Sequence, residues 1–259
     1  MQFFKSNVLF LVIIVVGISC SKKSIPSKTT PPPDPVNPVV VNEGNIDLWL
    51  TQPDKTYLFT NLKNFVNFTD KINNLPAIEI ETTQKFQQID GFGFCLTDGS
   101  AYLINKMSPD SKLKIVKELF GTDSTQIVIS YIRISIGASD LSSSVYSYDD
   151  MAGGQTDSLL TNFSIAPAMQ DMIPVLKQIL SINPKIKILG SPWSAPSWMK
   201  TNTNSKGGSL LSKYYHSYAK YFVKFIQAMA AEGITIDAIT PQNEPLNPDN
   251  NPNMYMQAT

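Results

Sequence analysis

The chain has 259 residues, 42% of them hydrophobic and 10% aromatic, enough for a sizeable core in one large domain or two small ones. Lys and Arg together number 21, as do Asp and Glu, so no charge excess indicates a nucleic acid or an anionic membrane as partner. The single histidine, His216, argues against a Ser-His-Asp triad and a multi-histidine metal site. Two cysteines in dissimilar surroundings, Cys20 and Cys95, do not form a disulfide framework. The chemistry is therefore expected from carboxylates, without metal or cofactor.

Residues 1–20 have the pattern of a secretory signal. Lys5 precedes the apolar stretch Val8–Val16, which is too short to span a bilayer comfortably. Cys20 follows small residues, as at the cleavage site of a bacterial lipoprotein, so we predict a lipoprotein signal peptide with Cys20 as the lipidated residue. The protein would then be exported and lipid-anchored in the bacterial cell envelope. An ordinary signal peptide or an uncleaved anchor is the alternative.

Two segments separate this leader from the more regular part of the chain. Residues 21–45 are rich in proline, with Lys and Ser between, which is typical of an extended linker. Within residues 46–87, aliphatic side chains alternate with Asp47 and Trp49 over 46–50 and with Glu79 and Glu81 over 78–81. Both patterns predict half-buried strands. These strands are too few to close a domain, so we expect them to pair with other strands.

From residue 88 onward, strand and helix patterns alternate. A capping serine with proline and aspartate, Ser108-Pro109-Asp110, predicts the start of an amphipathic helix that Gly121 ends. Residues 137–165 are polar, lack periodicity and are long enough that a functional loop is expected. Further helices are predicted over 169–180 and 211–229. Strands are predicted over 89–96, 127–136, 186–189 and 234–239. Such alternation predicts a parallel sheet, with the strands of half an eight-stranded barrel.

Glu244 is the strongest candidate for a catalytic group. It lies in Asn243-Glu244-Pro245, just after the strand predicted over 234–239, and barrel enzymes carry their acids and bases at such strand ends. Hydrolysis of a glycosidic bond needs a proton donor, a role that fits Glu244, while Asn243 could hydrogen-bond a sugar hydroxyl beside the cleaved bond. The alternative interpretation is a solvated acid in an exposed turn.

Two tryptophans, Trp193 and Trp198, follow the strand predicted over 186–189. Aromatic faces stack on sugar rings while polar neighbours bind the hydroxyls. We expect Trp193 to face a sugar, and leave Trp198 open between sugar contact and packing.

Three charged residues complete the predicted site. Arg133, in the strand predicted over 127–136, could lie under the site and favour an ionised carboxylate, or form a salt bridge between strands. Asp98 and Asp140 follow strands and could hold sugar hydroxyls by charge-assisted hydrogen bonds. Either could instead cap a loop, and the sequence Thr97-Asp98-Gly99 favours a turn for Asp98.

Taken in order, these motifs resemble glycoside hydrolase family 30, which includes lysosomal glucosylceramidase and bacterial β-glucosidases, β-1,6-glucanases and xylanases. The resemblance runs from about Ile46 to the end of the chain and is carried by Gly91–Asp98, Arg133 with Ala138–Asp140, Ser191–Asn202, Tyr221–Phe225 and Gln242–Pro245. It implies an α/β fold, a (β/α)8 TIM barrel with a β-sandwich side domain built from both chain ends. Residues 46–87 would supply N-terminal strands of the side domain, and residues 88–259 about the first four strands of a truncated barrel.

The resemblance also implies roles for individual residues. Glu244 would be the general acid/base, Asn243, Trp193 and Asp140 would contact the sugar, and Arg133 would support the site; Asp98 is kept as a further candidate for binding substrate. The family retains anomeric configuration, so its two carboxylates should lie ~5 Å apart. The nucleophile would come from a seventh strand, whereas four are predicted here, so we expect this fragment alone to be inactive.

The expected activity is that of a retaining glycoside hydrolase cleaving β-glucosidic bonds, similar to glucosylceramidase. A β-1,6-glucanase or xylanase of the same family is one alternative, and a non-catalytic glycan-binding lipoprotein is another. The expected partners are a β-linked glucoside or glucan and, through a lipid anchor only, a membrane.

Overall fold

The structure is a computed structural model that describes residues 46–63, 65, 74–123, 125–247 and 249–257. The chain separates into two compact units, Met1–Thr83 and Gln84–Thr259, each of which is described by itself. The signal peptide predicted over 1–20, its Cys20 and the linker predicted over 21–45 lie outside the described residues. Within the described ranges, no helix combines the length and apolar character needed to cross a membrane.

The first unit contains a short antiparallel pair of strands, β1 (Trp49–Leu50) and β2 (Thr60–Asn61). Trp49 stacks on Phe59 with ring centroids 4.7 Å apart, which fixes the turn between the strands. The strand predicted over 46–50 is therefore present in shortened form. The strand predicted over 78–81 is not present: no strand among the described residues pairs with this segment, and Ile78 is 93% exposed.

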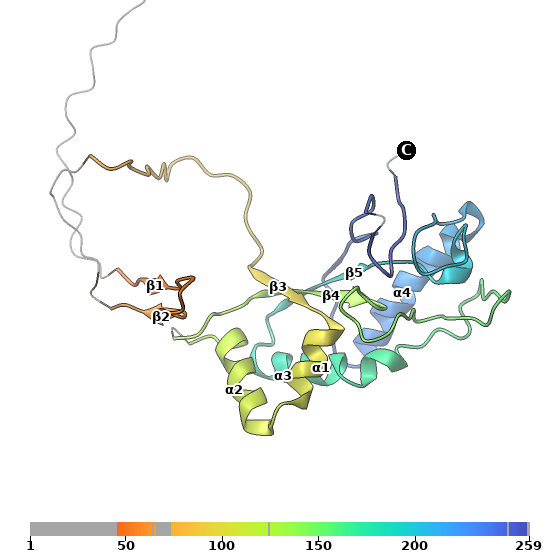
Figure 1. The fold of residues 1–259 in the computed structure, drawn as a ribbon, viewed down its shortest axis with the longest axis horizontal. Helices are drawn as coiled ribbons and strands as arrows, with labels where there is room; N and C mark the ends of the chain where they lie inside the picture. The colour runs from red at the N-terminus through yellow and green to blue at the C-terminus, as the bar shows by residue number, and fades with distance from the viewer. Residues whose placement is uncertain (1–45, 64, 66–73, 124, 248, 258–259) are drawn as a thin grey trace, which may run out of the picture. The chain divides into compact units, whose positions relative to one another are not determined.

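The second unit contains a four-stranded parallel sheet in the order β3-β4-β5-β6, as the alternating sequence pattern predicts (Figure 1). Its strands are β3 (Gly93–Leu96), β4 (Tyr131–Ile136), β5 (Lys187–Pro192) and β6 (Ala238–Ile239). Strands that are parallel and adjacent place their carboxyl ends at one edge of the sheet, where the loops that follow them meet.

Four α-helices connect these strands: α1 (Asp98–Lys106), α2 (Pro109–Phe120), α3 (Met172–Ile182) and α4 (Tyr215–Ala231). Short 3-10 turns lie at η1 (Ala166–Met169), η2 (Ser197–Met199) and η3 (Ser212–Tyr214). α2 begins and ends where its caps predict, with Ser108 Oγ accepting from the Ser111 N–H at 3.4 Å. α1 was not predicted; Thr97 caps it through a hydrogen bond from the Ser100 N–H.

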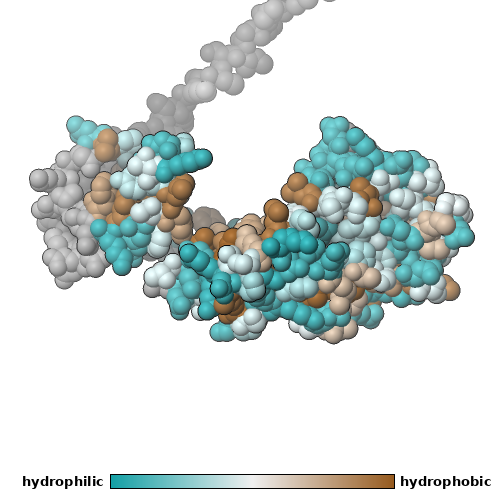
Figure 2. Space-filling view, turned by 60° about the horizontal axis from the view of Figure 1, so that its bottom comes forward, coloured by the Kyte–Doolittle hydropathy of each residue, from teal (hydrophilic) through white to brown (hydrophobic). Residues whose placement is uncertain are grey.

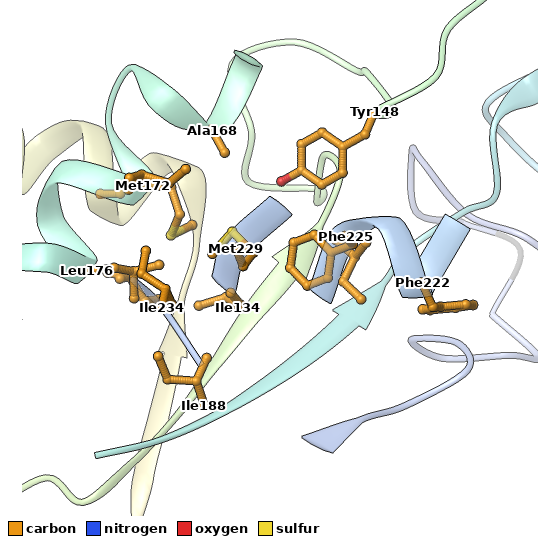
Figure 3. Close-up of a cluster of buried hydrophobic side chains, with 14 of the residues drawn as sticks. Ile134, Tyr148, Ala168, Met172, Leu176, Ile188, Phe222, Phe225, Met229 and Ile234 are labelled. Carbon is orange, nitrogen blue, oxygen red and sulfur yellow. The ribbon is translucent and has the colours of Figure 1, made fainter. Parts of the chain in front are cut away.

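The core lies between the sheet and helices α3 and α4, where Ile134, Ile188, Leu176 and Phe225 meet (Figure 3). Along β4, Ile132, Ile134 and Ile136 are buried on this side, so the intervening residues face the other side of the sheet. A Cβ on Gly190 would lie 3.2 Å from the Phe225 ring, so glycine lets α4 pack closely on β5. The sheet thus has one apolar face and one face available for polar groups.

The long segment 137–165 has no helix or strand, as predicted, but it packs tightly on the core. Tyr148 anchors it, because its ring stacks on Phe225 with centroids 5.8 Å apart (Figure 3). In addition, the backbone N–H of Tyr148 donates to the Tyr221 hydroxyl at 3.0 Å. Leu160 is fully buried. Residues 137–165 are thus a packed loop whose position is set by aromatic contacts.

Hydrophobic side chains also reach the surface, and on the face shown in Figure 2 brown patches lie among hydrophilic residues. In the second unit Phe86 is 86% exposed and Phe92 is 72% exposed, both in the stretch that leads into β3. This stretch buries little apolar surface, and its fold depends mainly on backbone pairing. For example, the Phe92 carbonyl accepts hydrogen bonds from the backbone N–H groups of Ser130 and Tyr131.

Candidate active site

The carboxyl ends of β5 and β6 are joined by hydrogen bonds that continue beyond the strands. The Thr240 N–H donates to the Gly190 carbonyl at 3.0 Å, and the Asn243 N–H donates to the Pro192 carbonyl at 2.8 Å. The Gln242 Nε2 then donates to the Trp193 carbonyl at 2.6 Å. The two loops that carry Trp193 and Glu244 therefore run side by side, as expected for parallel strand ends.

Arg133 on β4 connects these two loops. Its Nη2 donates to Ser191 Oγ at 2.8 Å and to Asn243 Oδ1 at 2.7 Å, and its guanidinium lies 4.6 Å from the centre of a Trp193 ring. Charge-assisted hydrogen bonds of this kind are about twice as strong as neutral ones. The salt bridges formed by the described residues are Lys177–Glu232 and Lys187–Asp237, so Arg133 does not serve as an ion-pair stitch between strands here.

The contact with Arg133 fixes which way the Asn243 amide faces. Guanidinium groups are donors only, so the Asn243 atom beside Arg133 must be its carbonyl oxygen. The Nδ2 group then turns away, 3.5 Å from Glu244 Oε2. Asn243 consequently presents an N–H donor toward the Glu244 carboxylate.

Glu244 is exposed and is held by amide donors. Its Oε2 accepts hydrogen bonds from the Nδ2 groups of Asn247, at 2.9 Å, and of Asn250. The backbone φ of Glu244 is 44°, a left-handed conformation that side-chain-bearing residues adopt rarely and at a cost of about 1–3 kcal/mol. Strain of this kind persists only where surrounding contacts enforce it, and the amide donors of Asn247 and Asn250 are such contacts.

Asn247 and Asn250 were not among the residues predicted for the site. The signal that could have found them is the run of asparagine and proline directly after Glu244, which favours a tight loop folding back on the carboxylate. The spacing of three and six residues does not by itself show which side chains turn inward.

The two tryptophans have different surroundings. Trp198 is 7% exposed, donates from Nε1 to the Asp149 carbonyl at 2.9 Å and packs edge-on against Tyr214, so it joins the loop 137–165 to the core. Trp193 is 5% exposed, with Arg133 against its ring. Its Nε1 is buried without a partner among the described residues, unlike that of Trp198. Trp193 therefore belongs to the cluster around Glu244, and Trp198 to the packing.

Asp98 and Asp140 line a hollow of about 450 Å³ whose lining includes none of the residues clustered around Glu244. Asp98 is the first residue of α1, and its Oδ2 accepts from Ser142 Oγ at 2.6 Å and from the Tyr146 hydroxyl at 2.7 Å. It thereby fastens the start of the loop 137–165, in keeping with the structural alternative considered for it. Asp140 is exposed at the rim of the hollow.

Cys95 on β3 lies near Arg133 of the Glu244 cluster and near Asp98 and Asp140 of the hollow. It is paired in register with Arg133 across β3 and β4. Burial raises the pKa of the Cys95 thiol, while the nearby Arg133 opposes this shift and the charges of Asp140 and Asp98 add to it. Arg133, Asp98 and Asp140 thus all lie within electrostatic reach of the Cys95 thiol. His216 on α4 is exposed and lies outside both groups.

Comparisons with known proteins match this part of the chain. The family model described as the glycosyl hydrolase family 30 TIM-barrel domain matches residues 89–259. An endo-1,6-β-D-glucanase from Neurospora crassa is 40% identical over 178 residues, which cover 66% of this chain and 36% of the relative. The lysosomal acid glucosylceramidase of Mus musculus is 34% identical over 175 residues, covering 65% of this chain and 33% of the relative.

Solved structures give the same result. A structure of an endo-β1,6-glucanase superposes with a TM-score of 0.65 at 36% identity, covering 79% of this chain and 44% of that chain. The structure of SrfJ from Salmonella typhimurium superposes with a TM-score of 0.62 at 29% identity. The match covers 66% of this chain and 38% of that chain. The chain spans about a third of the length of the two curated relatives described.

Proposed function

Because the chain belongs to glycosyl hydrolase family 30, we propose that it forms part of a retaining enzyme that hydrolyses β-glucosidic bonds, with Glu244 as the general acid/base. The observation that carries this proposal is the cluster at the β5 and β6 ends, where a strained, exposed glutamate lies beside the oriented amide of Asn243. Its position at the carboxyl edge of a parallel sheet is where barrel enzymes place reacting groups.

The chemistry follows from the hydrogen-bond partners. Glu244 would protonate the leaving oxygen of the glycosidic bond and later accept a proton from the water that releases the sugar. Asn243 would donate from Nδ2 to the hydroxyl next to the anomeric carbon, an interaction that strengthens in the transition state. Arg133 would keep the amide in this orientation. A retaining reaction also needs a second carboxylate as nucleophile, and we assign none of the described residues to that role.

For the substrate we propose a β-1,6-linked glucan. The support is that two relatives named endo-1,6-β-D-glucanase, from Neurospora crassa and Trichoderma harzianum, are each 40% identical to this chain, against 34% for the mouse glucosylceramidase. A glucosylceramidase-like β-glucosidase is the second candidate, because that relative matches the same stretch. Initial rates on β-1,6-glucan, glucosylceramide and xylan separate these candidates, and the fastest substrate should be the β-1,6-glucan.

The test of Glu244 uses the protein produced from its complete reading frame. In Glu244→Gln the side chain keeps its shape but has no proton to give, so kcat/KM on β-1,6-glucan should fall by about 10²–10⁴-fold. On 2,4-dinitrophenyl β-gentiobioside, whose leaving group needs no proton, the formation of the sugar–enzyme intermediate should be nearly as fast as in the wild type. Unchanged turnover of the glucan would refute the assignment, and glycan binding without any hydrolysis by the wild type would favour a non-catalytic binding protein.

We also propose that the protein is attached to a bacterial membrane through a lipid on Cys20. The support is the sequence pattern alone: a charged residue, a short apolar stretch and a cysteine after small residues. Labelled palmitate should be incorporated into the wild type and not into Cys20→Ser. Equal labelling of both proteins would contradict the anchor.

A further inference from the structure

Lys200 is a fully buried lysine close to the candidate site. Its relative exposure is 0%, whereas most lysines reach water with the charged end of the side chain. Burial lowers the pKa of Lys200 to about 8, as expected for an ammonium group taken out of water without a carboxylate partner. A buried charge of this kind is costly unless its donors are all used.

All three donors of Lys200 are used, on three different segments. Its Nζ donates to Ser194 Oγ at 2.9 Å, to the Ser205 carbonyl at 2.9 Å and to the Asn253 carbonyl at 2.7 Å. Ser194 directly follows Trp193, and Asn253 lies in the loop that begins with Glu244. Lys200 is therefore the point at which the β5 loop, the loop around residue 205 and the Glu244 loop are joined.

From Asn253 the connection continues to the carboxylate. The Asn253 Nδ2 donates to the Asn247 carbonyl at 2.6 Å, and the Asn247 Nδ2 donates to Glu244 Oε2 at 2.9 Å. Two of the three links from Lys200 to Glu244 are thus short side-chain-to-backbone contacts, and the last one touches the carboxylate itself. A shift of the Asn253 carbonyl would therefore be passed to the position of Glu244.

Lysine suits this position better than other side chains. An ammonium carries three donors arranged around one atom, which matches three acceptors from different directions, whereas the guanidinium of arginine has its donors fixed in a plane. A side chain of similar length without charge, such as methionine, would leave the carbonyls of Ser205 and Asn253 without this donor. The cost of burying the charge is therefore offset by fixing the geometry of three loops.

We propose that Lys200 is a positioning residue for the acid/base, which sets the place of Glu244 through Asn253 and Asn247. The inference rests on the proposed function of Glu244. Its distinguishing consequence is that loss of Lys200 should impair proton donation more than it impairs the other steps. General damage to the fold would slow the hydrolysis of all substrates alike.

The experiment measures single-turnover formation of the sugar–enzyme intermediate from two aryl β-gentiobiosides in the protein from the complete reading frame. One substrate carries phenol, which needs a proton to leave, and the other carries 2,4-dinitrophenol, which does not. In Lys200→Met the rate on the phenyl substrate should fall about 100-fold, as for a misplaced catalytic group, while the rate on the dinitrophenyl substrate should change less than about threefold. Equal losses on both substrates would overturn the proposal.

A second variant covers the case in which Lys200→Met does not fold. Asn253→Ala keeps the backbone carbonyl that Lys200 binds but removes the Nδ2 donor to Asn247, so it should show the same selective loss. If Lys200→Met does not fold, the result for Asn253→Ala decides, and equal losses on both substrates there would overturn the proposal. Leu176→Ala is the control for instability, because this fully buried residue lies on α3 among the residues of the apolar core. It should lower thermal stability without changing the ratio of the two rates.

The double variant Lys200→Met with Glu244→Gln separates this inference from the proposed function. If Lys200 acts through Glu244, the double variant should form the intermediate from the phenyl substrate less than about threefold more slowly than Glu244→Gln alone, because Glu244 can no longer donate a proton in either protein. Full additivity of the two losses would overturn the role of Lys200 while leaving that of Glu244 intact. If Glu244→Gln alone shows no leaving-group selectivity, both proposals fail.

Discussion

Replacement of Arg133 by methionine tests how the orientation of Asn243 is maintained. Methionine approximates the length of the arginine stem but removes the Nη2 donor to Asn243 Oδ1 and to Ser191 Oγ, as well as the cation over the Trp193 ring. The Asn243 amide could then rotate and present its oxygen, an acceptor, where it now presents a donor. The expected defect is in catalysis, because the amide contacts the hydroxyl next to the reacting carbon in the proposed complex.

The size of this defect can be worked out from the contacts. A hydrogen bond to a charged group contributes about 1.5–3 kcal/mol. If the loss of the Arg133–Asn243 bond is felt fully in the transition state, kcat/KM on β-1,6-glucan falls by about 10–150-fold, at 1.36 kcal/mol for each factor of ten. The ring contact with Trp193 adds about 0.5–2 kcal/mol, which affects mainly folding stability.

The assay compares two substrates that differ by one hydroxyl. On 2,4-dinitrophenyl β-gentiobioside, Arg133→Met should lower kcat/KM by the factor given above. On the 2-deoxy analogue, which lacks the hydroxyl that Asn243 would bind, wild type and variant should differ by less than about threefold. A variant within twofold of the wild type on both substrates would refute the orienting role, and an equal loss on both would indicate general damage.

Two further predictions concern stability. Asp98→Ala removes the acceptor for Ser142 and Tyr146, so the loop 137–165 should become more sensitive to limited proteolysis and the free energy of unfolding should drop by about 1.5–3 kcal/mol; an unchanged cleavage rate would contradict this. Burial, with the charge of Asp157 nearby, raises the pKa of Asp149 to about 6. The folded state therefore holds this proton more tightly than the unfolded state, and the stability that Asp149 contributes is present below about pH 4 and lost as pH rises through about 6. Asp149→Asn should remove about 1–2 kcal/mol of this pH dependence, as measured by unfolding at pH 4 and pH 7, and identical slopes for variant and wild type would argue against it.

The elements that local rules govern could be predicted from the sequence. Ser108 and Gly121 mark the ends of α2 because caps act within one turn of the helix. The parallel sheet could be predicted because strand and helix patterns alternate along the sequence. The short helix α1 was missed because Thr97-Asp98-Gly99 also fits a turn, and only Thr97 capping the Ser100 N–H distinguishes the two.

Strand lengths were predicted less well, for a physical reason that β6 shows. The apolar pattern predicts a strand over 234–239, but β6 covers only Ala238–Ile239. Just before it, the Asp237 carboxylate accepts from the Ile188 N–H at 2.9 Å, so a side chain replaces the backbone in the ladder. This competition between the Asp237 side chain and the backbone depends on Ile188, 49 residues away in the sequence. The apolar periodicity of 234–239 carries no information about that partner.

The candidate site likewise contains residues that could be predicted from the sequence and residues that could not. Arg133, Trp193, Asn243 and Glu244 could be predicted to meet, because each lies on or after a parallel strand and strand ends converge. Asn247, Asn250 and Lys200 could not, because their contacts depend on how a loop folds back over Glu244. The path of the loop is a tertiary property, because it depends on hydrogen bonds to distant segments, such as the one from Lys200 to the Asn253 carbonyl, 53 residues away.

Two cations hold the Glu244 segment, one on each side of the strained residue. Arg133 holds the residue before Glu244 by a side-chain hydrogen bond, and Lys200 holds the loop nine residues after it at Asn253. Neither forms a salt bridge with another described residue, and both donate instead to amide, carbonyl and hydroxyl oxygens whose positions they fix. With both ends of the segment held, the left-handed φ of 44° at Glu244 can be enforced, at a cost of about 1–3 kcal/mol. Because strained backbone persists only where surrounding contacts enforce it, releasing either end should let Glu244 relax and shift its carboxylate.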